Sequence, residues 1–140
     1  DADNQVLVEL LEQHGISDRV TLLGMRSDIP AIMSALDVHV LSSAYGEACP
    51  NVVAEAMACE TPCIVTAVGD SALLVGDTGW VVPPSHPAEL ATAISQAIDA
   101  RAAGSTWTHR QANCRQRIES NFNLQSMVQG YNSVWHNAVS

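Results

Sequence analysis

Hydrophobic residues along the chain follow two patterns, one typical of buried strands and one typical of helices. Four short and nearly continuous apolar runs, at residues 20–23, 38–41, 63–66 and 79–82, predict strands that are covered on both faces of a sheet. Between these runs, apolar residues recur every three or four positions, as they do on the buried face of an amphipathic helix. The alternation of the two patterns indicates an α/β fold.

Residues that start or stop helices mark the boundaries of the predicted helices. Asp3 or Asn4 can cap a first helix that ends at Gly15, and Pro30 stands in the first turn of a second. Further helices are predicted at residues 52–58, around 90–98, around 112–119 and around 124–137, with a loop at residues 69–71.

Strands that are separated by helices in this way are parallel and joined by right-handed crossovers. We therefore predict a Rossmann-like parallel sheet with flanking helices, in one domain over residues 1–140 whose last part, about 108–140, is helical. Ligands of such sheets bind beyond the carboxyl ends of the strands. The segments that follow the predicted strands are residues 24–26, 42–51, 67–71 and 82–85.

Charge and composition narrow the classes of protein. The formal net charge is −9 and all six basic residues are arginines, so general nucleic-acid binding, which needs a basic surface, is disfavoured. No apolar run reaches the roughly 18 residues that span a bilayer, and nothing at the start of the chain has the pattern of a signal peptide. The four cysteines lack metal-binding spacing and are typical of thiols in a reducing compartment, so we expect a cytoplasmic protein.

Residues 42–58 carry the most informative chemistry. Glu47 lies in the loop after the second predicted strand, and Glu55 lies among apolar neighbours in the next helix. A carboxylate in apolar surroundings needs hydrogen-bond partners, and the hydroxyls of a sugar or ribose are suitable ones. The start of the same helix offers free N–H groups to a phosphate, from Ala48, Cys49, Asn51 and Val52. On spacing alone, however, Glu47 could be a loose helix cap and Glu55 could point to solvent.

The residues around the two glutamates form an ordered set of motifs. Residues 47–58 read as E-x7-E followed by A-M-A, and Thr61-Pro62-Cys63 and Val68-Gly69-Asp70 follow in order. This set resembles the donor site of retaining glycosyltransferases of the GT-B fold, of the group 1 or family 4 type. Further agreement lies in residues 18–20, 22–24, 26–30, 37–38 and 76–80, Phe122 and Tyr131.

The resemblance implies a role for each matching position. Glu47 is the implied catalytic residue and contacts hydroxyls of the transferred sugar, and Glu55 binds the ribose. The sugar and diphosphate are also held by the backbone amides of Ala48, Cys49, Asn51 and Val52 and by Ser42 and Ser43, and the nucleobase is bordered by Gly24, Met25 and Arg26. For the two serines, a cap or turn role is an equal alternative.

The implied reaction moves a hexosyl unit from a UDP- or GDP-sugar to a glycan or lipid-linked acceptor. The nucleotide sugar is the donor substrate, and neither a cofactor nor a metal ion is expected. Asp1-Ala2-Asp3 has the form of the metal-binding D-x-D of another glycosyltransferase fold, but it follows no apolar strand, and Asp3 is better interpreted as a helix cap.

Two substitutions depart from the family pattern. Glu60 stands where the family usually has glycine, and a glutamate in a left-handed cap costs about 1 kcal/mol. Ala67 stands where aspartate is common, which weakens a polar role for that loop.

The family also has two strands, a glycine-rich turn with an Arg and a Lys, and an acceptor-binding domain before the first residue of this chain. We therefore expect an N-terminally truncated C-terminal half of a GT-B fold, nearly inactive alone, with residues 20–23 deprived of neighbouring strands. The alternative is a non-catalytic module that binds a nucleotide sugar or a partner. Association of the parent with a membrane surface, and a homodimer through exposed strand edges, are further hypotheses.

Overall fold

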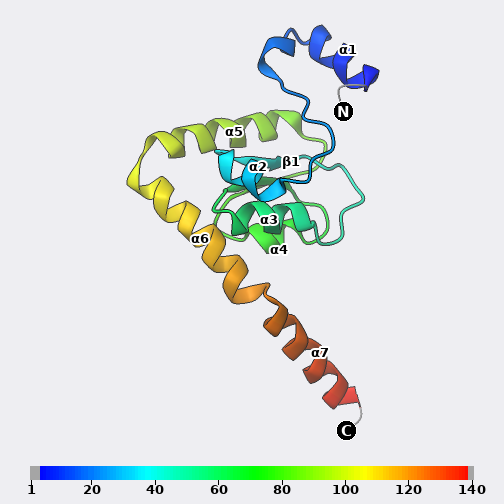
Figure 1. The fold of residues 1–140 in the computed structure, drawn as a ribbon, viewed down its shortest axis with the longest axis vertical. Helices are drawn as coiled ribbons and strands as arrows, with labels where there is room; N and C mark the ends of the chain where they lie inside the picture. Colours follow the sequence, from blue (N-terminus) through cyan, green and yellow to red (C-terminus); the bar gives the residue numbers. More distant parts are fainter. Residues whose placement is uncertain (1–3, 139–140) are drawn as a thin grey trace.

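The computed structural model describes residues 4–138 and has three layers around one small sheet (Figure 1). In chain order the elements are α1 (Gln5–Gln13), the 3-10 helix η1 (Ser17–Arg19), α2 (Ile29–Ala35), β1 (His39–Leu41), α3 (Asn51–Ala58), β2 (Cys63–Thr66), α4 (Ser71–Val75), β3 (Trp80–Val82), α5 (Pro87–Ala102), α6 (Ser105–Asn121) and α7 (Leu124–Ala138).

The sheet is parallel, with β2 between β1 and β3. All four residues of β2 are buried, because helices cover both faces of the sheet. Cys63 and Val65 pack with α2, α3, α4 and α6, whereas Ile64 faces the other way and packs with α5. Side chains of a strand alternate between its two faces, so β2 belongs to both clusters of the core. The predicted parallel α/β architecture is confirmed.

The predicted strand at residues 20–23 is wrong. This segment is part of an irregular connection between η1 and α2, and it pairs with no strand in the part of the chain that the structure describes. Val20 and Leu23 are exposed. Its apolar character is that of a strand, but a strand exists only through hydrogen bonds to a neighbour, and a local pattern cannot supply that neighbour.

Helix boundaries agree with the sequence except in two places. The predicted loop ends one residue early, because Ser71 begins α4, a five-residue helix that was not predicted and that carries buried Leu74 and Val75. The helix expected around residues 112–119 begins earlier, at Ser105, directly after Gly104, whose φ of 68° separates it from α5. At the first helix, Asn4 is the cap, since its side chain accepts a hydrogen bond from the N–H of Leu7 at 3.1 Å. Asp1, Ala2 and Asp3 lie outside the described residues.

Two arginines tie α6 to α4 and to the loop between α4 and β3. Arg117 donates hydrogen bonds from Nε to the carbonyl of Leu74 at 2.8 Å and from Nη2 to that of Leu73 at 2.7 Å. Arg110 donates to the carbonyl of Thr78 at 2.8 Å and lies 4.5 Å above the ring of Trp80. These contacts satisfy carbonyl groups that the short helix α4 and the loop after it leave unpaired.

Glu60 has a φ of 63°, so this glutamate takes a left-handed conformation that favours glycine. The strain was anticipated from the sequence. Because Glu60 lies on the surface directly after α3, the substitution leaves the core residues of α3 in place.

The two terminal helices lie away from the sheet. In Figure 1, α1 lies beyond α5 at one end of the molecule, and α7 extends from the end of α6 at the other. Neither helix has a buried residue. Among residues 4–138, no helix is both long enough and apolar enough to cross a membrane.

Candidate functional site

The carboxyl ends of the three parallel strands lie at one edge of the sheet, and the loops that follow them form the candidate site. The loop of residues 42–50 connects β1 to α3, residues 67–70 connect β2 to α4, and residues 83–86 connect β3 to α5. This is the edge at which parallel sheets bind ligands. The structure therefore brings three of the four segments singled out from the sequence to one place.

Glu47 is held in this loop by a defined contact. It is half-buried, and its Oε1 accepts a hydrogen bond from the hydroxyl of Ser43 at 2.6 Å. The carbonyl of Ser43 in turn accepts a hydrogen bond from the Thr66 hydroxyl, also at 2.6 Å. Glu47 is not the loose cap of α3 that spacing alone allowed, because no side chain caps that helix.

The backbone beside Glu47 is fixed from the opposite side by the loop after β2. The N–H of Asp70 donates to the carbonyl of Ala48 at 2.7 Å. Gly69 has a φ of 55°, and a Cβ atom there would come closer than 3.0 Å to the carbonyl oxygens of both Glu47 and Ala48. Only glycine permits this approach, so Gly69 shapes the candidate site, although sequence reasoning placed it in a motif without giving it a role.

The start of α3 supplies N–H groups next to Glu47. Pro50 is buried and is the N-cap residue, and the first intrahelical hydrogen bond joins the N–H of Val53 to its carbonyl at 3.1 Å. The amides of Asn51 and Val52 precede that bond and have no acceptor within the helix. Cys49 is exposed at the same helix start. An anion at this point would meet free N–H groups and the positive end of the helix dipole.

Glu55 lies on the rim of a mostly apolar pocket rather than inside one. The pocket has a volume of about 320 Å³ and is lined by Glu55, Ala58 and Cys59 of α3 and by Ile29 and Pro30 of α2. The glutamate itself is exposed. Its sequence neighbours are apolar, but the buried face of α3 consists of Val53, Ala56 and Met57, and position 55 points away from that face. The expectation of a carboxylate in apolar surroundings is thus only partly met.

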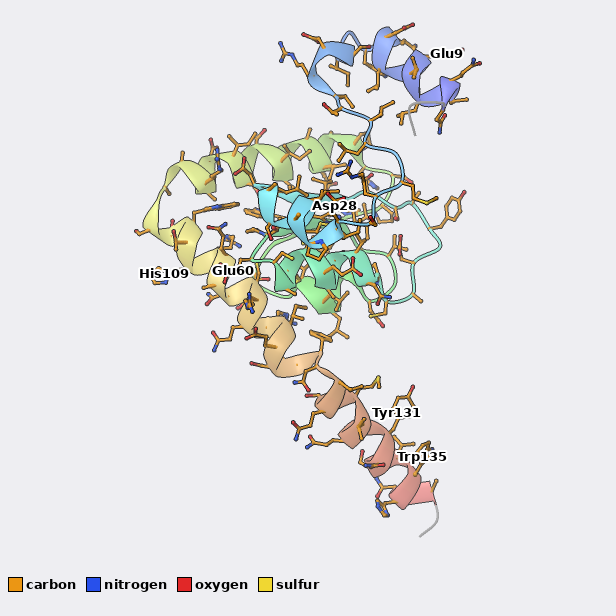
Figure 2. All side chains as sticks on the ribbon, viewed as in Figure 1. Glu9, Asp28, Glu60, His109, Tyr131 and Trp135 are labelled. Carbon is orange, nitrogen blue, oxygen red and sulfur yellow. The ribbon has the colours of Figure 1, made fainter. Side chains whose placement is uncertain are left out.

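The segment expected to border the nucleobase lies just before α2. Met25 is fully exposed, and Arg26 forms a bidentate pair with Asp28, Nε to Oδ1 at 2.8 Å and Nη2 to Oδ2 at 2.6 Å. Asp28 lies at the start of α2 (Figure 2). This contact raises the pKa of Arg26 and lowers the pKa of Asp28. Gly24, with a φ of 64°, turns the chain before Met25.

Ser42 and Ser43 have different surroundings. Ser43 is the residue that holds Glu47, whereas Ser42 lines a second cavity of about 230 Å³ together with Thr66, Pro83, Ser85, His86, Pro87 and Leu90. The Nδ1 of His86 hydrogen-bonds to the carbonyl of Pro84 at 2.8 Å, and Nε2 takes no part in this hydrogen bond. Thr66 and His86 were not candidates from the sequence, and Ser85 lies in the segment 82–85 that was singled out there without a role for this residue. The feature that could have indicated all three residues is their position at or just after the carboxyl end of a strand, where parallel sheets bind ligands.

The described residues contain no cluster of three metal-ligating side chains. All four cysteines are free, and burial raises the pKa of the Cys63 and Cys114 thiols, which keeps them protonated and unreactive.

Another cavity, of about 300 Å³, lies between α6 and Asp77-Thr78. Because Asp77 and Thr78 precede β3, this cavity is at the opposite edge of the sheet from the candidate site.

Comparison with known families gives a clear result. Residues 1–100 match the family described as glycosyl transferases group 1. One curated relative is the UDP-Gal:alpha-D-GlcNAc-diphosphoundecaprenol alpha-1,3-galactosyltransferase of Escherichia coli, 30% identical over 115 residues, which are 81% of this chain and 28% of that protein.

Solved structures give the same picture. Sucrose-phosphate synthase from Thermosynechococcus elongatus superimposes with a TM-score of 0.79 at 31% identity, over 99% of this chain and 35% of that one. Anabaena HepE in complex with UDP has a TM-score of 0.83 at 25% identity, over 95% of this chain and 36% of that one. The chain thus spans about a third of the length of the proteins that it matches.

Proposed function

The chain belongs to the glycosyl transferases group 1 family, and on that premise we propose that it is the donor-binding part of a retaining glycosyltransferase. The proposed reaction moves a hexosyl unit from a nucleotide-diphosphate sugar to a glycan or lipid-linked acceptor. Anabaena HepE was solved with UDP and with UDP-glucose, which supports a nucleotide sugar as the donor of this chain.

The observation that carries the proposal is the placement of Glu47 at the start of α3. The loop after β1 carries this carboxylate, held by Ser43, and leads directly into the start of α3, where the amides of Asn51 and Val52 have no acceptor within the helix. The carboxylate accepts hydrogen bonds from sugar hydroxyls, and the amides of Ala48, Cys49, Asn51 and Val52 hold the diphosphate. As the glycosidic bond breaks, negative charge grows on the diphosphate, and fixed N–H groups stabilise it.

The two remaining parts of the donor extend from this point. Glu55 is about one helical turn from the start of α3 and accepts hydrogen bonds from the ribose hydroxyls at the rim of the 320 Å³ pocket. Gly24, Met25 and Arg26 lie just before the α2 residues that line the same pocket, so they border the nucleobase there. The donor would thus lie along α3, with its sugar at Glu47.

We propose that the 140-residue chain alone transfers sugar very slowly. Arg26 is paired with Asp28, Arg101 with Asp37 and Arg115 with Glu119. Arg110 and Arg117 bind backbone carbonyls. Within residues 4–138, only Arg19 of the six arginines has no such contact, so few cations are left to neutralise a leaving diphosphate and the helix amides supply most of that stabilisation. Rapid transfer by the purified chain would contradict this part of the proposal.

A second candidate function is a module that binds a nucleotide sugar or a partner without catalysis. The two candidates differ in the fate of the donor. Incubation of the full-length protein with UDP-glucose and analysis of the nucleotide released distinguishes them, since only an enzyme frees UDP at a rate that depends on Glu47.

The proposed donor site is tested by calorimetric titration of the protein with UDP, UDP-glucose, GDP and GDP-mannose. We expect one nucleotide pair to bind, and Glu55→Ala to weaken it about tenfold, because hydrogen bonds to a charged acceptor are lost. Glu12→Ala, on the exposed side of α1, is the matched control and should leave the affinity unchanged. An unchanged affinity in Glu55→Ala would remove the ribose from its assigned place.

Association and location are also proposals. β1 pairs with β2 on one side, and no strand of residues 4–138 pairs with its other edge. We propose that this edge is covered in the full-length protein, by further strands or by a second copy, and that the protein acts in the cytoplasm, in contact with membranes where its acceptor is lipid-linked. Light scattering at several concentrations tests the second copy, and a monomer at all of them would exclude it.

A further inference from the structure

Thr66 makes a contact at the candidate site that neither the sequence motifs nor the comparisons assign. It is the last residue of the central strand β2, and it is 4% exposed. Its hydroxyl donates to the carbonyl of Ser43 at 2.6 Å and lies 3.5 Å from the carbonyl of Leu41. A side chain of the most deeply buried strand thus reaches the loop that follows the neighbouring strand.

Ser43 extends this contact to the carboxylate. A serine hydroxyl carries one proton, and that of Ser43 is donated to Oε1 of Glu47 at 2.6 Å. The described structure shows no such contact for Oε2, so this oxygen is left to accept from a ligand. The hydrogen bond from Ser43 therefore orients the carboxylate of Glu47, and the hydrogen bond from Thr66 to the Ser43 carbonyl holds the backbone of Ser43 in position.

The other side of Glu47 is held by the loop that directly follows Thr66. Gly69 lies against the backbone of Glu47 and Ala48, and the N–H of Asp70 donates to the carbonyl of Ala48 at 2.7 Å. The end of β2 consequently fixes both the side chain and the backbone at position 47. A site held by a rigid strand keeps its geometry better than one held by loop contacts alone.

We propose that Thr66 is a positioning residue that sets the Glu47 carboxylate, through Ser43, for the sugar part of the donor. The proposal rests on the proposed function, because it takes Glu47 as the group that contacts the sugar. It distinguishes the two halves of the donor. Ribose and diphosphate are assigned to Glu55 and to the amides of α3, which Thr66 does not contact, so loss of its hydroxyl should affect recognition of the sugar and spare that of the nucleotide.

A purely structural role predicts a different result, and the chain contains a matched control. Thr78 is also buried, and its hydroxyl donates to the carbonyl of Val75 at 2.8 Å. It lies before β3, at the opposite edge of the sheet. Thr66→Val and Thr78→Val remove the same group from similar surroundings, and valine keeps the shape of threonine. Both should lower the free energy of unfolding, but only Thr66→Val should alter the sugar site.

The experiment measures dissociation constants of UDP and UDP-glucose by calorimetry, with GDP and GDP-mannose in parallel, for the wild type, Thr66→Val, Thr66→Ser, Ser43→Ala and Thr78→Val. The quantity of interest is the ratio of the constants for nucleotide sugar and nucleotide. We expect Thr66→Val and Ser43→Ala to raise this ratio about fivefold, mainly through weaker binding of the sugar nucleotide. Thr66→Ser keeps the hydroxyl and should restore the wild-type ratio, and Thr78→Val should not change it.

The possible failures are separable. If the wild type binds none of the four ligands, the proposed function is wrong and the role of Thr66 is overturned with it. If the wild type binds a pair and the ratio is the same in Thr66→Val, or changes equally in Thr78→Val, only the positioning role is overturned. A Thr66→Ser variant that behaves like Thr66→Val would also contradict it.

Discussion

The region around the sheet and the two terminal helices have the same periodic pattern of apolar residues, but those residues are buried only around the sheet. Within residues 4–138, the buried hydrophobic residues all lie between Met33 and Cys114, in the layers on the two faces of the sheet. In contrast, α1 and α7 are amphipathic helices with no buried residue. Tyr131 and Trp135 of α7 contact each other with their rings tilted by 43° and their centroids 6.0 Å apart, and both remain exposed (Figure 2). An apolar stripe thus predicts a helix, but not whether this chain covers it.

The difference matters for the candidate site, since every group assigned to the sugar and diphosphate stands on the packed region. Thr66 and Gly69 fix Glu47 from β2, and the amides belong to α3, whose buried face is Val53, Ala56 and Met57. We infer that donor binding depends on the packing of this region and is insensitive to changes in α1 and α7.

The largest predicted effect compares one leucine in each region. Leu74 in α4 is 1% exposed and Leu124 in α7 is 72% exposed. Leu74→Ala should lower the free energy of unfolding by about 2–5 kcal/mol, because it leaves a cavity in the core. Leu124→Ala should change it by less than about 0.5 kcal/mol. Urea unfolding measures both, and equal losses would mean that α7 is packed in solution.

The next effect compares two glycines that share a positive φ. Gly15 (φ 63°) has open space around its Cα, whereas a Cβ atom at Gly69 (φ 55°) would strike the backbone of residues 47 and 48. Gly15→Ala should cost about 1 kcal/mol of stability from backbone strain alone. Gly69→Ala should cost about 1–3 kcal/mol more, because the loop must move.

Binding provides the sharper readout of that pair. Gly69→Ala should also weaken binding of the nucleotide sugar, measured by calorimetry, whereas Gly15→Ala should not. If both glycine variants bind the donor equally well, the approach of Gly69 to Glu47 has no importance for the site.

The smallest predicted effect is a dependence of stability on pH. Burial lowers the pKa of His39, which lies in β1 and whose Nδ1 has no hydrogen-bond partner in the described structure. The folded state therefore favours the neutral ring, whereas the unfolded chain binds a proton below about pH 6.5. Stability is complete above that pH and decreases as the pH falls through and below it. His39→Leu should flatten this decrease in urea unfolding between pH 7 and 5, and an unchanged slope would exclude His39 as its cause.

The sequence was sufficient to predict features that depend on neighbouring residues along the chain, such as the buried strand β2. Cys63, Ile64 and Val65 form an unbroken apolar run because both faces of β2 are covered, and that burial is what the run reports. Residues 20–23 are equally apolar but form no hydrogen bonds to another strand in the described structure, since strand pairing depends on a neighbour that is distant in sequence. For the same reason Glu55 looked buried among its apolar neighbours, whereas the helical turn places it outside the face of Val53, Ala56 and Met57.

The candidate site shows the same division. Glu47 and the start of α3 could be selected from the sequence, because their chemistry lies in one continuous segment. Thr66 could not be linked to Glu47, since the two residues belong to different strand ends and meet only through Ser43. The close approach of Gly69 to Ala48 likewise depends on how two loops pack.

The measurement that tests the donor site most directly is an NMR titration of the ¹⁵N-labelled protein with UDP-glucose, followed at every backbone amide. The account predicts that the amide signals of Ala48, Cys49, Asn51 and Val52 shift most, together with those of Thr66 to Asp70. Signals around Asn113, Gln116 and Asn121, which line the 300 Å³ cavity at the other edge of the sheet, should stay in place. Shifts confined to that second group, with none at the start of α3, would contradict the account.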